Sequence, residues 1–125
     1  ITDFPIFRDM RGSIKNILDA KIGSVSCIIS KKGATRGNHY HKTDSHYCYI
    51  HSGRMRYFCR PFGTESDTVH DIIVESNQMV YTPPMWCHMM YFPEDTVMWV
   101  FAKNPRDQAS YEKDIVRIPQ LIEIV

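Results

Sequence analysis

The sequence lacks long apolar runs, an excess of charge of one sign, and closely paired cysteines. No apolar stretch approaches the roughly 20 residues that a membrane-spanning helix needs, and no signal-peptide pattern opens the chain. Lys and Arg number 15 against 14 for Asp and Glu, so no strong field attracts nucleic acid or an anionic membrane. The four cysteines form no CxxC pair, which favours reduced thiols in a cytoplasmic protein. These absences argue against nucleic acid and membranes as partners and leave a small-molecule substrate.

The chain has the length and composition of one domain, residues 1–125, with one core. It contains 125 residues, of which 43% are hydrophobic, and this share is too large for a disordered chain. The first residue is Ile1 and not Met. A domain cut from a longer protein is therefore one interpretation that we keep.

Short extended stretches rich in Val, Ile, Tyr, Phe and Thr alternate with turns along most of the chain. The expected strands are Ser24–Ser30, Ser45–Ser52, Arg54–Arg60, Thr68–Glu75, Gln78–Thr82, Cys87–Phe92 and Thr96–Ala102. No long stretch has the 3.6-residue period of a helix, and only Asp107–Asp114 indicates a short helical turn. Many short strands separated by turns predict an all-β sandwich or barrel.

Four of the six histidines fall where neighbouring strands could bring them together. His39 and His41 are two residues apart, so on a strand they share one face. His46 opens the next expected strand, and His88 opens a later one. Because imidazole is the commonest metal ligand near neutral pH, this pattern predicts a site for Zn, Fe, Mn, Ni or Cu inside the barrel.

The spacing around these histidines resembles the first sequence motif of the cupins. That motif is Gly, five residues, His, one residue, His, three or four residues, Glu, six residues and Gly. The residues at those spacings here are Gly33, His39, His41, His46 and Gly53. The match is complete except that His46 replaces the glutamate.

The second cupin motif survives in part. Pro83 and His88 stand at its spacing, whereas Asn77, Met85 and Phe92 replace its two glycines and its asparagine. Two spaced motifs at the right separation imply the cupin fold. We therefore expect a single jelly-roll β-barrel made of two packed antiparallel sheets.

The cupin resemblance also implies a metal site. Cupin metal centres resemble a set of three histidines and one glutamate, so His39, His41, His46 and His88 are the implied ligands of a divalent metal ion, with Zn, Fe, Mn and Ni not distinguished. Four neutral ligands leave more of the ion's charge uncompensated than a set with a carboxylate, which favours anionic ligands. The alternative is that His46 occupies the glutamate's position without binding metal.

Further stretches resemble cupins of sugar-nucleotide metabolism. Residues 36–42, RGNHYHK, are similar to segments of the dTDP-sugar ketoisomerases and of the cupin domain of capsular-polysaccharide reductases. Residues 83–90, PPMWCHMM, resemble the ketoisomerases around their second motif, and residues 9–13, DMRGS, resemble an opening shared with dehydrorhamnose epimerases. The resemblance implies an isomerase or epimerase of a nucleotide-linked keto-sugar, in polysaccharide biosynthesis.

The ketoisomerase resemblance implies roles for individual residues. His39 and His41 would be the acid–base pair of a metal-free proton transfer. Arg36 and Lys42 would hold the diphosphate, with solvated turn residues as the alternative. Trp86 would stack on the nucleotide base, although most aromatic residues of the chain are expected to pack the barrel.

The metal hypothesis and the metal-free isomerase hypothesis conflict at the histidines. The same ring nitrogen cannot bind a metal ion and accept a proton. The resemblance to the capsular-polysaccharide reductases relieves this conflict, because their cupin domain is linked to zinc.

Two other functions stay open on the sequence. A metal-dependent cupin oxygenase or lyase rests on the four histidines alone, and a non-enzymatic metal- or sugar-binding domain is consistent with a piece of a larger capsule enzyme. We also expect a homodimer, because the extended ends Thr2–Arg8 and Ile115–Val125 are able to exchange between subunits.

Overall fold

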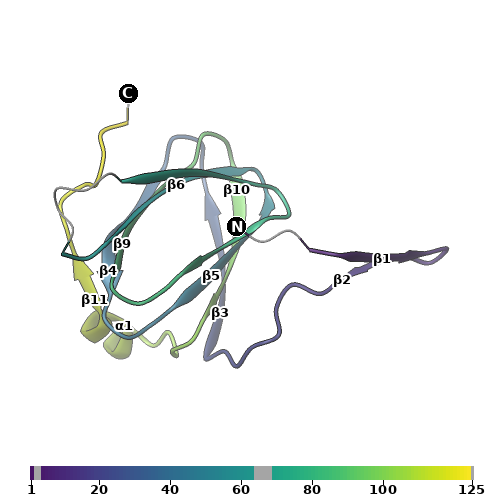
Figure 1. The fold of residues 1–125 in the computed structure, drawn as a ribbon, viewed down its shortest axis with the longest axis horizontal. Helices are drawn as coiled ribbons and strands as arrows, with labels where there is room; N and C mark the ends of the chain where they lie inside the picture. Colours follow the sequence, from purple (N-terminus) through teal and green to yellow (C-terminus); the bar gives the residue numbers. More distant parts are fainter. Residues whose placement is uncertain (2–3, 64–68, 125) are drawn as a thin grey trace.

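Two antiparallel sheets packed face to face make up the body of the molecule (Figure 1). The computed structural model describes residues 1, 4–63 and 69–124. Its elements are β1 (Ile6–Asp9), β2 (Gly12–Lys15), β3 (Ser24–Ser30), β4 (Thr35–His41), β5 (His46–Ser52), β6 (Arg54–Pro61), β7 (His70–Glu75), β8 (Met79–Thr82), β9 (Trp86–Tyr91), β10 (Thr96–Ala102), α1 (Gln108–Asp114) and β11 (Ile115–Arg117).

The strand orders of the two sheets are those of a jelly roll. One sheet has the order β3-β10-β5-β8 and the other has the order β11-β4-β9-β6-β7. Among the described residues no ladder joins the two sheets, so the expected barrel is present as two packed sheets without closure. The all-β cupin fold expected from the sequence is confirmed.

The expected strands agree closely with the observed ones. Ser24–Ser30 and Thr96–Ala102 begin and end as predicted, and they pair with each other along their whole length. The other bounds differ by one or two residues, and Thr68, in the expected strand Thr68–Glu75, lies outside the described residues. The agreement follows from the two-residue alternation of buried and exposed side chains.

The apolar core lies between the facing sides of the two sheets. One sheet contributes residues such as Ile50 and Met98, and the other contributes residues such as Met55, Tyr57 and Val74. The hydroxyl groups of Tyr57 and Thr82 hydrogen-bond to each other, which satisfies two polar groups within this core. This core forms the rigid base on which the site described below is built.

The C-terminal segment folds against its own chain. Asp107 caps α1 by accepting a hydrogen bond from the backbone N–H of Ser110 at 3.0 Å, so the expected helical turn is confirmed. The next residues form β11, in which Ile115 pairs with His41 of β4. Ile115–Arg117 is therefore engaged within the chain and is not a free strand for exchange.

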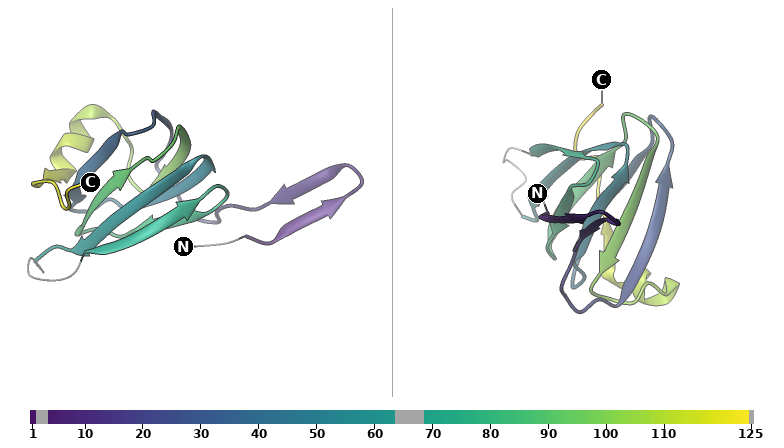
Figure 2. Two further views of the ribbon diagram at one scale, coloured as in Figure 1. Left: turned by 90° about the horizontal axis from the view of Figure 1, so that it is seen from above. Right: turned by 90° about the vertical axis from the view of Figure 1, so that its right-hand side faces the viewer.

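The N-terminal hairpin projects from the body of the molecule, as Figures 1 and 2 show for β1 and β2. Phe7 and Ile14 lie opposite each other in this hairpin and are 62% and 67% exposed. An isolated two-stranded hairpin is marginally stable in water.

In the part of the chain that the structure describes, no helix is long and apolar enough to span a membrane.

The homodimer stays a prediction, and the hairpin is the segment that we expect to make it. Phe7 and Ile14 would leave water by packing on a second copy, so the wild-type protein should sediment at twice 14.6 kDa. Phe7→Lys should shift the distribution toward 14.6 kDa, whereas Lys21→Gln, outside the hairpin, should not. A wild-type sample containing only the 14.6 kDa species would contradict the prediction.

Candidate functional site

A cavity of about 310 Å³ lies between the two sheets beside α1. Its walls combine residues of β3, β5 and β10 on one side with residues of β4 and β9 on the other. Apolar side chains such as Met90, Met98 and Val100 form part of the wall. The polar side chains that line the cavity include three histidines (His39, His46 and His88) and two carboxylates (Asp44 and Asp114), and convergent titratable groups of this kind mark a site for chemistry.

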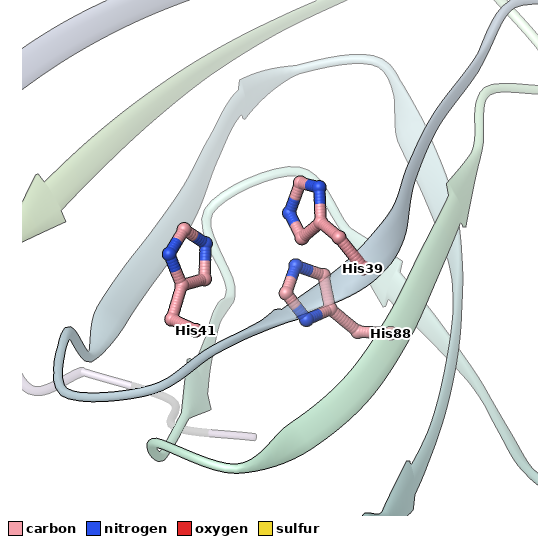
Figure 3. A group of neighbouring side chains, drawn as sticks. All are labelled: His39, His41 and His88. Atoms are coloured by element: carbon pink, nitrogen blue, oxygen red, sulfur yellow. The ribbon is translucent and has the colours of Figure 1, made fainter. Parts of the chain in front are cut away.

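Three histidines converge in this part of the fold, as Figure 3 shows. His39 and His41 come from β4, and His88 of β9 pairs directly with His39. The ring centroid of His39 lies 4.9 Å from that of His41 and 4.6 Å from that of His88. One nitrogen from each ring lies within 4.8 Å of the others, so the three side chains are close enough to bind one metal ion.

A bulge in β4 places His39 opposite His88. The register shifts between Gly37 and His39, so Asn38 is an extra residue in this strand. Gly37 and Asn38 both have positive φ, at 88° and 57°. The turn of the backbone at these two residues sets the position of His39 relative to β9.

His41 is held by a carboxylate on one side and has an unsatisfied nitrogen on the other. Its Nδ1 lies 3.2 Å from Oδ2 of Asp114, the last residue of α1. Its Nε2 is buried and has no hydrogen-bond partner among the described residues. An orphaned buried nitrogen of this kind is costly unless a ligand satisfies it.

His46 belongs to a second group. Its Nε2 lies 2.9 Å from Oδ2 of Asp44, and its ring centroid lies 4.4 Å from that of His41. His41, Asp44 and His46 thus form a second set of three closely spaced ligand atoms. The sequence placed four histidines in one cage, whereas the structure has two groups that share His41.

Burial keeps the three converging histidines neutral. It lowers the pKa of His39 to about 2, with a further contribution from the neighbouring His88 and His41. It lowers the pKa of His88 to about 4, against the opposing effect of the Trp86 carbonyl. The pKa of His41 is also lowered, first by burial and then by His46. Neutral imidazole is the form that binds metal, whereas such a low pKa makes a weak general base near pH 7.

The carboxylate of Asp44 is charged in spite of its location. Burial alone would raise the pKa of Asp44, but hydrogen bonds from His46 and from the backbone N–H groups of Asn104 and Ser45 lower it overall. A charged Asp44 accepts a hydrogen bond from Nε2–H of His46. In a neutral His46 ring, this contact places the hydrogen on Nε2 and leaves Nδ1 without one.

The substrate-binding residues expected from the sequence are only partly at the cavity. Arg36 lines it, with Nε donating to Ser30 Oγ at 2.9 Å and Nη2 donating to the carbonyl oxygen of Ile29 at 3.1 Å. Lys42 is exposed in the turn after β4 and is not among the lining residues. Trp86 is half-buried against the apolar core and does not line the cavity either.

Sequence reasoning missed two carboxylates and the wall that α1 provides. Asp44 stands two residues before His46, so a search for carboxylates beside the histidines would have found it. Asp114 and Tyr111 carry no such signal, because they reach the histidines only through the packing of α1.

The donor set fits a divalent transition metal. His39, His41 and His88 are neutral imidazoles, and the buried Nε2 of His41 lacks a partner among the described residues. Imidazole ligands suit Zn, Fe, Ni and Cu. These three residues are the ones that would hold such an ion.

Comparison with known proteins shows the family. The model of the polysaccharide biosynthesis C-terminal domain matches residues 7–110. No curated protein sequence matches the chain.

Several solved structures share the fold. The capsular polysaccharide assembling protein CapF from Staphylococcus aureus is 23% identical, with a TM-score of 0.69 over 96% of this chain and 33% of CapF. The sugar 3,4-ketoisomerase QdtA from Thermoanaerobacterium thermosaccharolyticum, in complex with TDP, is 23% identical, with a TM-score of 0.74 over 92% of this chain and 84% of QdtA. The dTDP-4-dehydrorhamnose 3,5-epimerase from Sulfolobus tokodaii is 18% identical, with a TM-score of 0.77 over 95% of this chain and 76% of the epimerase.

The chain spans about a third of the length of CapF and most of the length of the two enzymes. The cupin fold expected from the histidine motifs agrees with all three structures. With its residues 7–110 matched, the chain belongs to the polysaccharide biosynthesis C-terminal domain family and has a cupin fold.

Proposed function

We propose that this protein acts on a nucleotide-linked keto-sugar by moving a proton at the carbon beside the carbonyl group. The proposal is carried by the presence of two groups of histidines beside one cavity. Three neutral histidines converge, of which His39 and His88 line the cavity, and a fourth, His46, is oriented by Asp44 in the wall of the same cavity. Together they supply a metal-binding group and a separate acid–base group.

The comparisons support a sugar nucleotide as the substrate class. Two of the similar structures are enzymes that act on keto-sugars, a 3,4-ketoisomerase and a 3,5-epimerase. The ketoisomerase was solved in complex with TDP. Both reactions begin with removal of a proton next to a carbonyl group, which is the chemistry that we assign to this cavity.

His39, His41 and His88 would hold a divalent ion, which would supply Lewis-acid chemistry at the sugar carbonyl. The conflict between metal binding and acid–base chemistry then disappears, because the two tasks fall to different residues. His39 and His41 were the acid–base pair expected from the sequence. Their lowered pKa values make them better ligands than bases.

His46 is the residue that we propose to move the proton. Asp44 accepts from Nε2–H of His46, which leaves Nδ1 to take the proton from the sugar carbon. The same Nδ1–H then delivers the proton to the neighbouring carbon, while the hydroxyl proton of the sugar moves to the former carbonyl oxygen, so the carbonyl group shifts by one carbon with no net gain or loss of protons. This arrangement, a base held by a carboxylate, is the one that orients histidine in many enzymes.

The size of the cavity sets what part of the substrate enters it. At about 310 Å³ it lies at the lower end of the range for small-molecule sites, about 300–1,000 Å³. We propose that the sugar ring occupies the cavity and that the diphosphate remains at its rim. Arg36 and Arg106 both line the cavity. The guanidinium carbon Cζ of Arg106 lies 4.1 Å from the ring centroid of Tyr111. Either guanidinium offers a bidentate contact to phosphate oxygens.

One observation favours a second function. His41, Asp44 and His46 form a set of two histidines and one carboxylate. This set is the ligand type of non-haem iron oxygenases. Iron in the purified protein together with oxygen consumption would favour the oxygenase over the isomerase.

The proposal predicts deuterium exchange that depends on His46. The protein is purified without chelator, its metals are quantified, and TDP-4-keto-6-deoxyglucose is incubated with it in D₂O and followed by NMR. We expect deuterium at the carbon beside the carbonyl group. His46→Gln should slow this exchange by about 10²- to 10⁴-fold, the usual contribution of a general base, while the metal content stays unchanged. No exchange with any of several nucleotide-linked keto-sugars would contradict the proposed function.

A further inference from the structure

Asp114, the last residue of α1, contacts both His41 and the turn after β4 through its carboxylate. Its Oδ1 accepts hydrogen bonds from the backbone N–H and from the hydroxyl group of Thr43, both at 2.7 Å. Its Oδ2 accepts from the backbone N–H of Asp44 at 3.2 Å and lies 3.2 Å from His41 Nδ1. Both oxygens are therefore engaged, and each has a different set of partners.

The contact between Asp114 and His41 decides where the hydrogen of the imidazole ring resides. An ionised carboxylate only accepts hydrogen bonds, so the contact requires hydrogen on Nδ1 of His41. A neutral imidazole carries one ring hydrogen, which leaves Nε2 with a free lone pair. That nitrogen is the buried one without a hydrogen-bond partner among the described residues.

The backbone holds Asp114 in place independently of its carboxylate. Ile115, the next residue, pairs with His41 in the ladder between β11 and β4. In addition, the backbone N–H of Lys42 donates to the Asp114 carbonyl oxygen at 3.0 Å. Changing the charge of the side chain should therefore leave it facing His41.

We propose that Asp114 is a positioning residue that fixes the tautomer of His41, with hydrogen on Nδ1 and the lone pair on Nε2. The consequence for metal affinity rests on the proposed function, in which Nε2 of His41 is one of the ligands. A carboxylate behind a histidine ligand holds the ring and makes the ligating nitrogen more basic. In this role Asp114 links the C-terminal helix to the centre of the site.

Asp114→Asn is the variant that separates tautomer control from simple packing. Oδ1 accepts two short hydrogen bonds from Thr43, both at 2.7 Å, whereas Oδ2 accepts one longer bond from the backbone N–H of Asp44 at 3.2 Å. The amide oxygen should therefore keep the Oδ1 position, and the amide nitrogen should replace Oδ2 with loss of the Asp44 hydrogen bond. The NH₂ group would then donate to Nδ1 of His41 and force the ring hydrogen onto Nε2. The lone pair that faces the proposed metal would be lost without a change in side-chain shape.

The first measurement uses metal-free protein and the ¹⁵N chemical shifts of His41. We expect Nδ1–H in the wild type and Nε2–H in Asp114→Asn. The control is Thr43→Val, which removes one donor to Oδ1 and leaves the contact with His41 intact, so it should keep Nδ1–H. A wild-type protein with hydrogen on Nε2 of His41 would overturn the inference even if the variant failed to fold.

The second measurement is zinc affinity by competition with a chelator. Asp114→Asn should bind zinc about 10- to 100-fold more weakly than the wild type, the usual effect of losing such a partner, and Thr43→Val should stay near the wild type. Equal affinity in Asp114→Asn and the wild type would overturn the inference. Absence of zinc binding in the wild type would instead contradict the metal site of the proposed function, and the ¹⁵N shifts would still decide the role of Asp114.

Discussion

Replacing His88 by glutamine is expected to weaken metal binding strongly and to lower the metal content and the turnover of the purified protein. Nδ1–H of His88 donates to the carbonyl oxygen of Trp86 at 3.1 Å, so Nε2 carries the lone pair. Binding of zinc to small structural sites with four protein ligands is worth about 10–16 kcal/mol, or about 2.5–4 kcal/mol for each ligand. Loss of one ligand should therefore weaken binding by about 100- to 1,000-fold.

The measurement is elemental analysis after purification without chelator, followed by titration of zinc into stripped protein. A matched control is His51→Gln, the same chemical change at an exposed position of β5. The control should retain the metal content and the activity of the wild type. Full metal content in a folded His88→Gln protein, checked by circular dichroism, would show that His88 is not a ligand.

The strands were predictable because their signal is local. In β10, the alternation of buried and half-buried or exposed residues from Thr96 to Ala102 is visible as alternating side-chain types. The pairing of β10 with β3, more than 60 residues earlier in the chain, has no such local signal. It depends on which faces bury together, so the sequence analysis predicted the two strands but not their pairing.

The candidate site was predictable only as far as its own strands reach. His39, His41 and His88 stand in recognisable motifs on β4 and β9. Asp114 reaches His41 from 73 positions away in the sequence. No spacing rule joins a helix-terminal carboxylate to a strand histidine, because their proximity results from the docking of α1.

Two of the expected substrate-binding residues lie elsewhere for local reasons. Lys42 directly follows the last residue of β4, so the strand alternation that orients its neighbours ends before it. Trp86 is the first residue of β9, after Met85 with its positive φ of 64°. Its ring packs 6.3 Å from the ring of His70 and against the core. A position beside a motif was therefore a poor guide to a position in the cavity.

The bulge in β4 was the feature that alternation could not anticipate. A regular strand would carry the ladder through Asn38, whereas here the register skips from Gly37 to His39. Asn38 instead turns outward to the C-terminal segment, where its Oδ1 accepts from the backbone N–H of Leu121 at 3.0 Å. The position of His39 relative to His88 thus depends on one glycine and on the space around it.

Gly37→Ala is accordingly expected to damage both the fold and the site. A Cβ atom at Gly37 would lie 2.9 Å from the backbone oxygen of His88 and 3.3 Å from Cα of Met89. The positive φ adds about 1–2 kcal/mol of backbone strain for a residue with a side chain, and the overpacking adds about 1–3 kcal/mol. The loss of about 2–5 kcal/mol should lower the Tm by roughly 8–20 °C.

The chain offers a control that isolates the contact from the backbone strain. Gly33 has nearly the same φ, 89°, but a Cβ atom there would meet nothing within 4 Å. Gly33→Ala should therefore lose only the strain of about 1–2 kcal/mol and should bind zinc as the wild type does. Gly37→Ala should in addition bind zinc more weakly, because relieving the contact with the His88 backbone separates β4 from β9 and moves His39 away from His88. Equal thermal shifts and equal zinc affinities in the two variants would mean that the close approach of Gly37 to β9 does not set the geometry of the histidines.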